Sequence, residues 1–357
     1  MTAKTLKMGM HTVGEGQPVC IVFEAGPTHD GIVSAKKLVD MAVHAGANAI
    51  KFQMVNAKRL VPSKDTMFTY EALVDKATKK SERVTESLQE ILLRRELKPQ
   101  EWQELIRYCK EKDILFFSTA TYEDEVILLH EAGCDCIKIC SGDINHFSLL
   151  RLVARYPWIV QIDTGSATIG EVEQAVDVLE SAGCDRIIIN HCPSGYPAKL
   201  TDINLRVLAT LRRMFPYPVA FSDHTPGNIM DVAAVALGAH MIEKTITLDK
   251  TTSSPEHIMS LEYDEAGSFV ATIRDVETAL GNSRRSLGEK ERKNACVARR
   301  SIVAACDISN GTCIEATMLD YARPGDGLSP NLDTLIIGHE TRRDFVKGEK
   351  IFPYDVK

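Results

Sequence analysis

SAKKLVDMAVHAGANAIKFQ, residues 34–53, contains the repeating unit that decides the fold. Its first half has apolar residues at helical spacing, and the pair Ala45-Gly46 is typical of a helix end. The following run, 48–53, is apolar on both sides of the chain and short enough for a buried strand. The unit is therefore a helix followed by a strand with both faces covered.

The same pattern recurs along the first two-thirds of the chain. Apolar runs rich in Val, Ile and Phe alternate with helical stretches, many of which end in Ala-Gly or Leu-Gly. Eight such runs are present: 18–26, 48–53, 115–120, 136–142, 158–165, 186–192, 218–224 and 241–248. Eight parallel strands under helices predict an α/β fold of the (β/α)8 TIM-barrel type, with a doubly wound open sheet as the structural alternative.

The remaining segments suggest how the chain is divided. Residues 5–16 are expected to form a hairpin that closes the barrel floor, and the long connection 56–97 is either a lid, a subunit contact or a surface excursion. We predict a barrel domain over 1–280, a polar linker over 281–298 and a small β-rich domain over 299–357, with short strands at 301–304 and 334–337. About sixty residues form a marginal core, so this domain is expected to lean on another surface.

Composition excludes several classes of partner. The formal net charge of −7 and the pI near 5.9 argue against binding nucleic acid or an anionic membrane. No signal-peptide core or apolar stretch of membrane-spanning length is evident, so we expect a cytoplasmic protein. Several of the ten cysteines lie in apolar strand-like runs, which favours reduced thiols packed in a core over disulfides or a metal site.

Polar residues gather where the predicted strands end. In a barrel of this kind the C-terminal ends of the strands form the active site, so these positions are the candidate site. Lys51 and Lys138 lie within buried strands, where an ammonium needs a counter-charge such as a phosphate or carboxylate. Glu24, Asp223 and Glu243 are possible ion-pair partners. His224 suits a core histidine, a general base or a metal ligand equally well.

The ordered motifs resemble those of the N-acetylneuraminate (sialic acid) synthase family, which includes legionaminic and pseudaminic acid synthases. They are EAGPTHDG (24–31), IKFQ (50–53), KICSGD (138–143), SDHT (222–225), TLDKT (247–251), PEHIMSLE (255–262), RRSIVA (299–304) and RPGDGLSP (323–330). The resemblance covers essentially the whole chain. It implies a barrel followed by an antifreeze-like (SAF) domain, which in the family covers the active site of the partner subunit.

The resemblance also implies residue roles. Lys51, Lys138 and Ser141 would bind phosphoenolpyruvate, while Glu24, Asp143 and Arg323 would contact the aldehyde sugar. The other substrate contacts would be Gln53, Thr119, Tyr196, Ser222 and Glu256. His224 would ligate a divalent metal, manganese or magnesium. In the implied reaction carbon 3 of phosphoenolpyruvate attacks the aldehyde, water adds at carbon 2 and phosphate leaves. A domain-swapped homodimer would bring Arg323 to the neighbouring barrel.

Several positions depart from the family pattern. Thr245 stands where the second metal-binding histidine is expected, which predicts a weakened or altered metal site. Asp163 replaces a serine, Glu256 an aspartate and Asp143 a glutamate, so we interpret the chain as retaining phosphoenolpyruvate with a changed acceptor. Two alternatives remain: another phosphoenolpyruvate-dependent aldol-type synthase, and a catalytically silent carbohydrate-binding protein.

Overall fold

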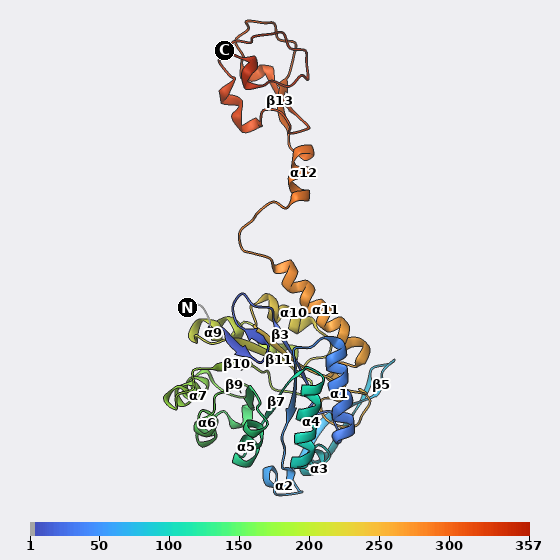
Figure 1. Ribbon diagram of the computed structural model, residues 1–357. Coiled ribbons are helices and arrows are strands. Elements are labelled where there is room, and N and C mark those ends of the chain that lie inside the picture. Colours follow the sequence, from blue (N-terminus) through green and yellow to red (C-terminus); the bar gives the residue numbers. More distant parts are fainter. Residues whose placement is uncertain (1–3) are drawn as a thin grey trace. The chain divides into compact units, whose positions relative to one another are not determined.

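The computed structural model describes residues 4–357, so the first three residues of the predicted barrel domain lie outside it. The chain divides into two compact units, one ending at Gly281 and the other spanning Asn282–Lys357. No helix in residues 4–357 is long and apolar enough to cross a membrane. Figure 1 shows the helices and strands of each unit, coloured along the sequence.

The first unit is built on a closed barrel of eight parallel strands, which confirms the fold class and rules out the open sheet. In barrel order the strands are β10 (Ile187–His191), β11 (Val219–Asp223), β12 (Met241–Thr245), β3 (Cys20–Glu24), β4 (Ala49–Gln53), β7 (Leu115–Thr119), β8 (Cys136–Ile139) and β9 (Ile159–Asp163). Pairing of β12 with β3, in which Thr245 faces Glu24, closes the ring.

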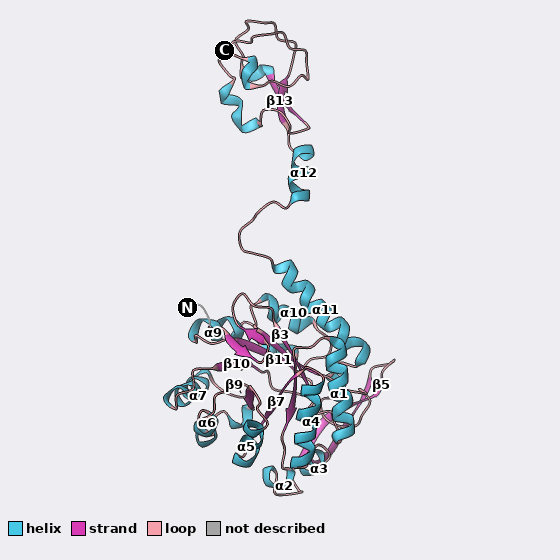
Figure 2. Ribbon diagram, in the orientation of Figure 1, coloured by secondary structure: helices cyan, strands magenta, loops and turns pink. Residues whose placement is uncertain are grey.

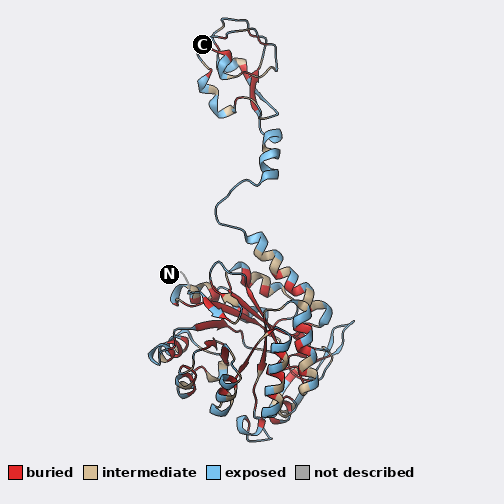
Figure 3. Ribbon diagram, in the orientation of Figure 1, coloured by how far each residue is buried: buried red, intermediate tan, exposed pale blue. Residues whose placement is uncertain are grey.

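Helices surround the barrel and cover its outer surface (Figure 2). They are α1 (Ile32–Ala45), α4 (Pro99–Glu111), α5 (Glu123–Glu131), α6 (Phe147–Val153), α7 (Ile169–Ser181), α8 (Leu200–Ile203), α9 (Val207–Met214), α10 (Ile229–Ala236) and α11 (Tyr263–Leu280). Gly46 ends α1 in the left-handed region, with φ 80°, and its N–H donates to the last carbonyls of the helix, as the Ala-Gly signal predicts. Figure 3 shows the result, with buried strands inside and exposed outer helix faces.

Strand alternation divides each barrel strand between two environments. One set of side chains packs outward against the helices as the main core. The other set points into the barrel, and its lower layer is apolar, with Phe117, Ile159 and Ile188 fully or almost fully buried. The hairpin of β1 (Leu6–Met8) and β2 (His11–Val13) packs Met8 and Val13 against this layer, so the prediction that it closes the floor is confirmed.

The long connection after β4 has its own structure. It contains α2 (Ala57–Leu60), the antiparallel pair β5 (Met67–Asp75) and β6 (Lys80–Ser87), and α3 (Leu88–Leu93). Val84, Leu88, Ile91 and Leu92 have the spacing of one helical face, but Val84 lies in β6 and only the later three residues are helical. Lys76, in the turn between β5 and β6, pairs with Asp249 at 2.9 Å and with Glu262 at 2.6 Å, which ties the hairpin to the loop after β12.

The second unit starts with a helix and then forms a compact β-rich body. Part of the predicted linker is helical, as α12 (Glu289–Ala298), supported by a Glu289–Lys293 pair at 2.8 Å. Strands β13 (Ser301–Ala304) and β14 (Leu319–Ala322) are antiparallel, and short 3-10 helices occur at Ala316–Met318, Pro330–Leu335 and Pro353–Asp355. The expected strand at 334–337 is wrong, because a 3-10 helix that begins at Pro330 runs to Leu335. Ile302, Ile336 and Phe345 belong to this unit's own buried core.

Candidate active site

A cavity of about 170 Å³ opens inside the barrel at the C-terminal ends of its strands. It brings together nine of the residues predicted from the sequence: Glu24, Lys51, Gln53, Thr119, Lys138, Ser141, Tyr196, His224 and Glu256. Asp163 and Glu243 line it as well. Strand alternation explains the grouping, because these strand residues occupy the same inward-facing positions as the apolar floor, one or two layers higher.

Glu243 links the two lysines at the base of this cavity. Its Oε1 lies 3.0 Å from the Nζ of Lys51 and 2.6 Å from the Nζ of Lys138. Lys51 also pairs with Glu24, and Lys138 lies 2.9 Å from Oδ2 of Asp163. Ser222 donates to the same Glu243 oxygen at 3.2 Å, so Ser222 lies behind the cavity wall and supports Glu243. Two ammonium groups are therefore enclosed by three carboxylates.

The protonation states follow from this arrangement. Burial alone would lower the pKa of both lysines, but the carboxylates beside them raise it above its ordinary value, so both stay charged. Burial raises the pKa of Asp163 against the opposing effect of Lys138. The pKa of Glu243 is held below its usual value, because the two lysines outweigh the cost of burial. Asp163 is thus better suited than Glu243 to accept a proton.

Glu24 is fixed at the rim by its own loop. The Gly26 N–H donates to Oε1 of Glu24 at 2.6 Å, and the Gln53 amide donates to Oε2 at 3.1 Å. A Cβ atom at Gly26 would lie 2.6 Å from the backbone nitrogen of Gln53 and 2.8 Å from Oε1 of Glu24. This close approach therefore requires glycine. The EAG part of the first motif therefore serves to orient the Glu24 carboxylate.

Glu256 projects into the cavity from the loop after β12. Its backbone is left-handed, with φ 78°, an uncommon conformation for a residue with a side chain. Within residues 4–357 its carboxylate makes no hydrogen bond, and burial raises its pKa to about 7 although Arg95 opposes this. At neutral pH Glu256 is therefore divided between a carboxylate and a neutral hydrogen-bond donor.

His224 has the protonation state of a metal ligand, but its surroundings do not complete a metal site. Its Nδ1 donates to the Pro193 carbonyl at 3.0 Å, and burial lowers its pKa to about 4, which leaves Nε2 unprotonated. Glu243 is occupied by both lysines, and Thr245 offers only a hydroxyl. Within residues 4–357 no group of three or more His, Cys, Asp or Glu side chains is arranged to hold a metal ion. The residues present do not fit a full metal site.

The suggested role of Asp223 as an ion-pair partner of the cavity lysines is wrong. Asp223 pairs with Lys244, whose Nζ also lies 3.3 Å from Asp231 of α10, so all three face the helix layer and none balances the cavity lysines. Asp143 is half-buried beside the cavity, where it accepts from Cys140 Sγ at 3.1 Å. Arg323 belongs to the second unit.

The sequence missed several apolar residues of the wall. Leu60 of α2 and Leu92 of α3 line the cavity, so the long connection after β4 contributes to the site. Met54 and Val55, directly after β4, also line it. Their apolar character gave no functional signal, although the unusual length of the connection pointed to this segment.

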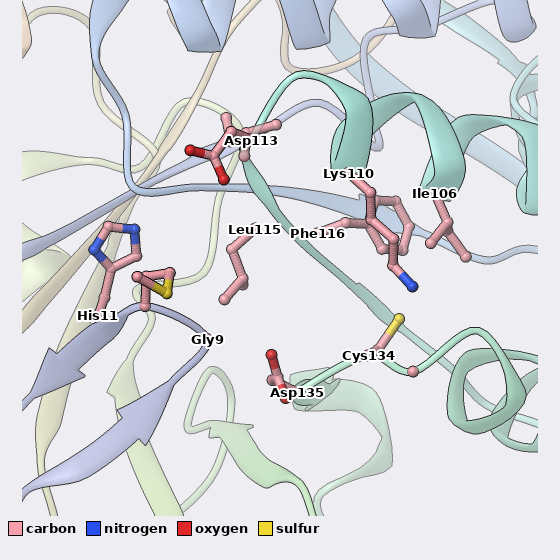
Figure 4. Close-up of a pocket in the computed structure, with 12 residues that line it drawn as sticks. Gly9, His11, Ile106, Lys110, Asp113, Leu115, Phe116, Cys134 and Asp135 are labelled. Atoms are coloured by element: carbon pink, nitrogen blue, oxygen red, sulfur yellow. The ribbon is translucent and has the colours of Figure 1, made fainter.

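A larger cavity, of about 280 Å³, lies at the opposite end of the barrel between the hairpin turn and the starts of β7 and β8 (Figure 4). Gly9, Leu115 and Asp135 line it, and none of the predicted site residues does. Volume is therefore a poor guide here, whereas the convergence of buried charges selects the smaller cavity.

A closed (β/α)8 barrel with buried charged side chains at the C-terminal ends of its strands has the architecture of TIM-barrel enzymes. Comparison with known proteins gives the family. Residues 38–285 match the NeuB family and residues 299–357 match the SAF domain. The chain belongs to the NeuB family, which confirms the resemblance seen in the sequence.

Its relatives include proteins that are named as synthases of legionaminic acid and of N-acetylneuraminate 9-phosphate. It is 35% identical to N,N'-diacetyllegionaminic acid synthase of Campylobacter jejuni over 93% of this chain and 98% of the relative. It is 32% identical to human N-acetylneuraminate-9-phosphate synthase over 86% and 84%. The crystal structure of N-acetylneuraminic acid (sialic acid) synthetase from Leptospira borgpetersenii in complex with citrate has a TM-score of 0.71 and 29% identity, covering 82% of this chain and 95% of that one.

The raised pKa of Glu256 predicts a pH-dependent stability. The folded protein binds its proton up to pH of about 7 and the unfolded chain only up to about 4.5, so this group makes folding less favourable as pH rises through that window. Relative to Glu256→Gln, the parent should lose at most about 3 kcal/mol between pH 5 and 8. Urea unfolding followed by the two tryptophans, Trp102 and Trp158, both in the barrel unit, measures this.

Glu82→Gln, which changes an exposed carboxyl, is the control and should follow the parent at every pH. A constant difference between parent and Glu256→Gln across this pH range would show that Glu256 is ionised throughout and would refute the assignment.

Proposed function

We propose that this protein condenses phosphoenolpyruvate with an N-acetylated aldehyde sugar, N-acetylmannosamine or a related deoxy-diacetamido hexose, to give a nonulosonic acid and phosphate. The observation that carries the proposal is the buried pair Lys51 and Lys138 joined by Glu243 at the barrel mouth. Membership of the NeuB family and the names of its synthase relatives support the same reaction.

The lysines bind the anionic substrate in this proposal. The carboxylate and phosphate of phosphoenolpyruvate take over ammonium hydrogen-bonding positions now occupied by Asp163 and Glu24, while Glu243 keeps the two lysines in place. Ser141, which lines the same wall, adds a hydroxyl donor. Charge-assisted hydrogen bonds of this kind offset the charge that develops as phosphate leaves.

The acceptor occupies the outer part of the cavity. Carbon 3 of phosphoenolpyruvate forms a bond to the aldehyde carbon, and the aldehyde oxygen takes up a proton. Water adds at carbon 2. Cleavage of the bond between carbon 2 and the bridging phosphate oxygen then releases phosphate and leaves a carbonyl at carbon 2. In this proposal Glu24 and Tyr196, which line the cavity, contact sugar hydroxyls, and Glu256 in its neutral form donates a hydrogen bond to the acceptor.

Phosphate release over a panel of aldehyde sugars tests the function. We expect release from phosphoenolpyruvate only when a 2-acetamido aldehyde sugar is present, with a nonulosonic acid detected by mass spectrometry. Release with a different class of aldehyde would instead indicate another phosphoenolpyruvate-dependent aldol-type synthase. No release with any aldehyde, tested with and without Mn²⁺ and Mg²⁺, would leave the non-catalytic carbohydrate-binding alternative.

Substitution of either lysine should weaken binding of phosphoenolpyruvate. Lys51→Ala and Lys138→Ala each remove a charge-assisted hydrogen bond, which costs about 1.5–3 kcal/mol, or roughly a 10- to 150-fold rise in Kd. Calorimetric titration of each folded variant measures it. Lys244→Ala is a poor control because it leaves buried carboxylates unpaired, so Lys64→Ala, an exposed lysine, is used. Unchanged affinity in both cavity variants would refute the lysine assignment.

We also propose that a divalent metal, manganese or magnesium, binds weakly through the single imidazole of His224. Thr245 is buried and follows Glu243 at the inward-facing spacing of β12, at the position where the family resemblance implies a second histidine. Thr245→His should therefore tighten manganese binding, and His224→Ala should abolish it. Manganese titration followed by electron paramagnetic resonance reads this without turnover. Equal affinity in the parent and both variants would remove His224 from this role.

Another residue predicted to contact the sugar, Arg323, belongs to the second unit. Arg323 is exposed, and among residues 4–357 it has no ion-pair partner. We propose that Arg323 of one chain completes the cavity of a second chain in a domain-swapped homodimer, where its planar guanidinium binds a carboxylate or sugar oxygens.

Mixing two inactive variants tests the swapped dimer. Lys138→Ala and Arg323→Ala chains, each nearly inactive alone, should recover activity when subunits exchange, because one cavity of each heterodimer then receives both intact residues. Arg342→Ala, which changes another exposed arginine of the same unit, should not impair the parent. Exchange without recovered turnover would mean that Arg323 acts within its own chain or has no role.

A further inference from the structure

A second cavity, of about 310 Å³, lies at the C-terminal end of the barrel next to the candidate active site. The end of β3 lines the first cavity through Glu24, and the loop that follows it lines the second through Thr28 and His29. The loop after β12 does the same, with Ser254 in the second cavity and Glu256 in the first. The substrate proposed above makes no use of this second cavity.

Arg95, at the end of the long connection after β4, is the buried cation of this cavity. Its side chain is 5% exposed, and its Nη2 donates to Ser254 Oγ at 3.1 Å and to the Pro255 carbonyl at 3.3 Å. No carboxylate in residues 4–357 lies within ion-pairing distance of it. A buried guanidinium without a counter-ion is costly, and arginine stays charged at any physiological pH.

Its neighbour Arg94 provides a contrast on the same wall. Both terminal nitrogens of Arg94 donate to the Glu86 carboxylate, at 2.7 and 2.9 Å, and its side chain is largely exposed. Lys76 and Asp249 likewise neutralise each other at the rim. Asp30 is exposed at the edge of the cavity. Arg95 therefore carries the uncompensated charge of the buried part.

Neutral hydrogen-bond donors surround this charge. His29 Nδ1 accepts from the Gly31 N–H at 3.4 Å, which places the ring proton on Nε2, and that atom is buried without a partner in the described chain. Ser253 and Ser254 add hydroxyls to the lining. One guanidinium with several neutral donors is the environment that an oxyanion requires.

We propose that this cavity binds a phosphate-type oxyanion through Arg95 and Ser254. The phosphate is either free inorganic phosphate or a phosphate group carried by the acceptor sugar; the second source rests on the proposed function. The competing explanation is that Arg95 balances Glu256 on the other side of the loop. That residue is a weak counter-charge, because burial raises its pKa to about 7.

Calorimetric titration with inorganic phosphate tests the site on the full chain saturated with phosphoenolpyruvate, which occupies the lysine cavity. We expect one phosphate per chain to bind, with Kd at least tenfold higher in Arg95→Gln and within twofold of the parent in the matched control Arg94→Gln. If Arg95→Gln does not fold, Arg95→Lys and Ser254→Ala replace it, and each should show a smaller rise in the phosphate Kd. Equal phosphate affinity in the parent and in all Arg95 and Ser254 variants would overturn the proposal, as would loss of phosphate binding when phosphoenolpyruvate is added.

Kinetics with paired acceptors separate the two sources. If the acceptor carries the phosphate, Arg95→Gln should lower the ratio of kcat/KM for a phosphorylated sugar to that for the same unphosphorylated sugar at least tenfold. An unchanged ratio together with lost phosphate binding identifies free phosphate as the ligand. Phosphate titration needs no turnover, so failure of the condensation assay and failure of this site are distinguishable.

Discussion

The carboxylate of Glu243 is the interaction on which the candidate site depends. It holds the ammonium groups of Lys51 and Lys138, which come from the two strands on either side of β7, against one oxygen atom. Two like charges this deeply buried would repel each other and be unstable without it. Glu24 and Asp163 extend the pairing on either side. The enclosed lysines are thus kept charged and in position before any substrate arrives, which is the preorganisation that binding of an anion requires.

The barrel keeps this charge cluster apart from its apolar lower layer. Inward-facing residues of each strand are apolar near the floor, where Met8 and Val13 of the hairpin seal them from water, and polar in the layers above. A shift of one residue in any strand would exchange the inward and outward sets. The fold and the site are therefore specified by the same alternation. On the outer side of the strands, Lys244 of β12 pairs with Asp223 of β11 and with Asp231 of α10.

Much of this could be predicted from the sequence, because helical spacing, Ala-Gly helix ends and doubly buried strands are local signals. The positions of Lys51 and Lys138 within buried strands followed directly. Side-chain partners did not: Asp223 and Glu243 are both acidic strand residues, and only their alternation relative to the barrel axis shows that Glu243 points inward and Asp223 outward. Arg95 and Leu92 were missed because the hairpin between β4 and α4 positions them through tertiary contacts. The predicted strand at 334–337 was wrong because the 3-10 helix that begins at Pro330 includes Thr334.

Proton uptake on binding phosphoenolpyruvate tests the central claim most directly. Three carboxylates already balance two lysines, and burial raises the pKa of Asp163, so a further anion should drive a proton onto Asp163. Titration at pH 8, with a metal chelator present and in two buffers of different ionisation enthalpy, gives the number of protons bound. The account predicts uptake by the parent and none by Asp163→Asn. Binding without proton uptake, or the same uptake in both proteins, would contradict it.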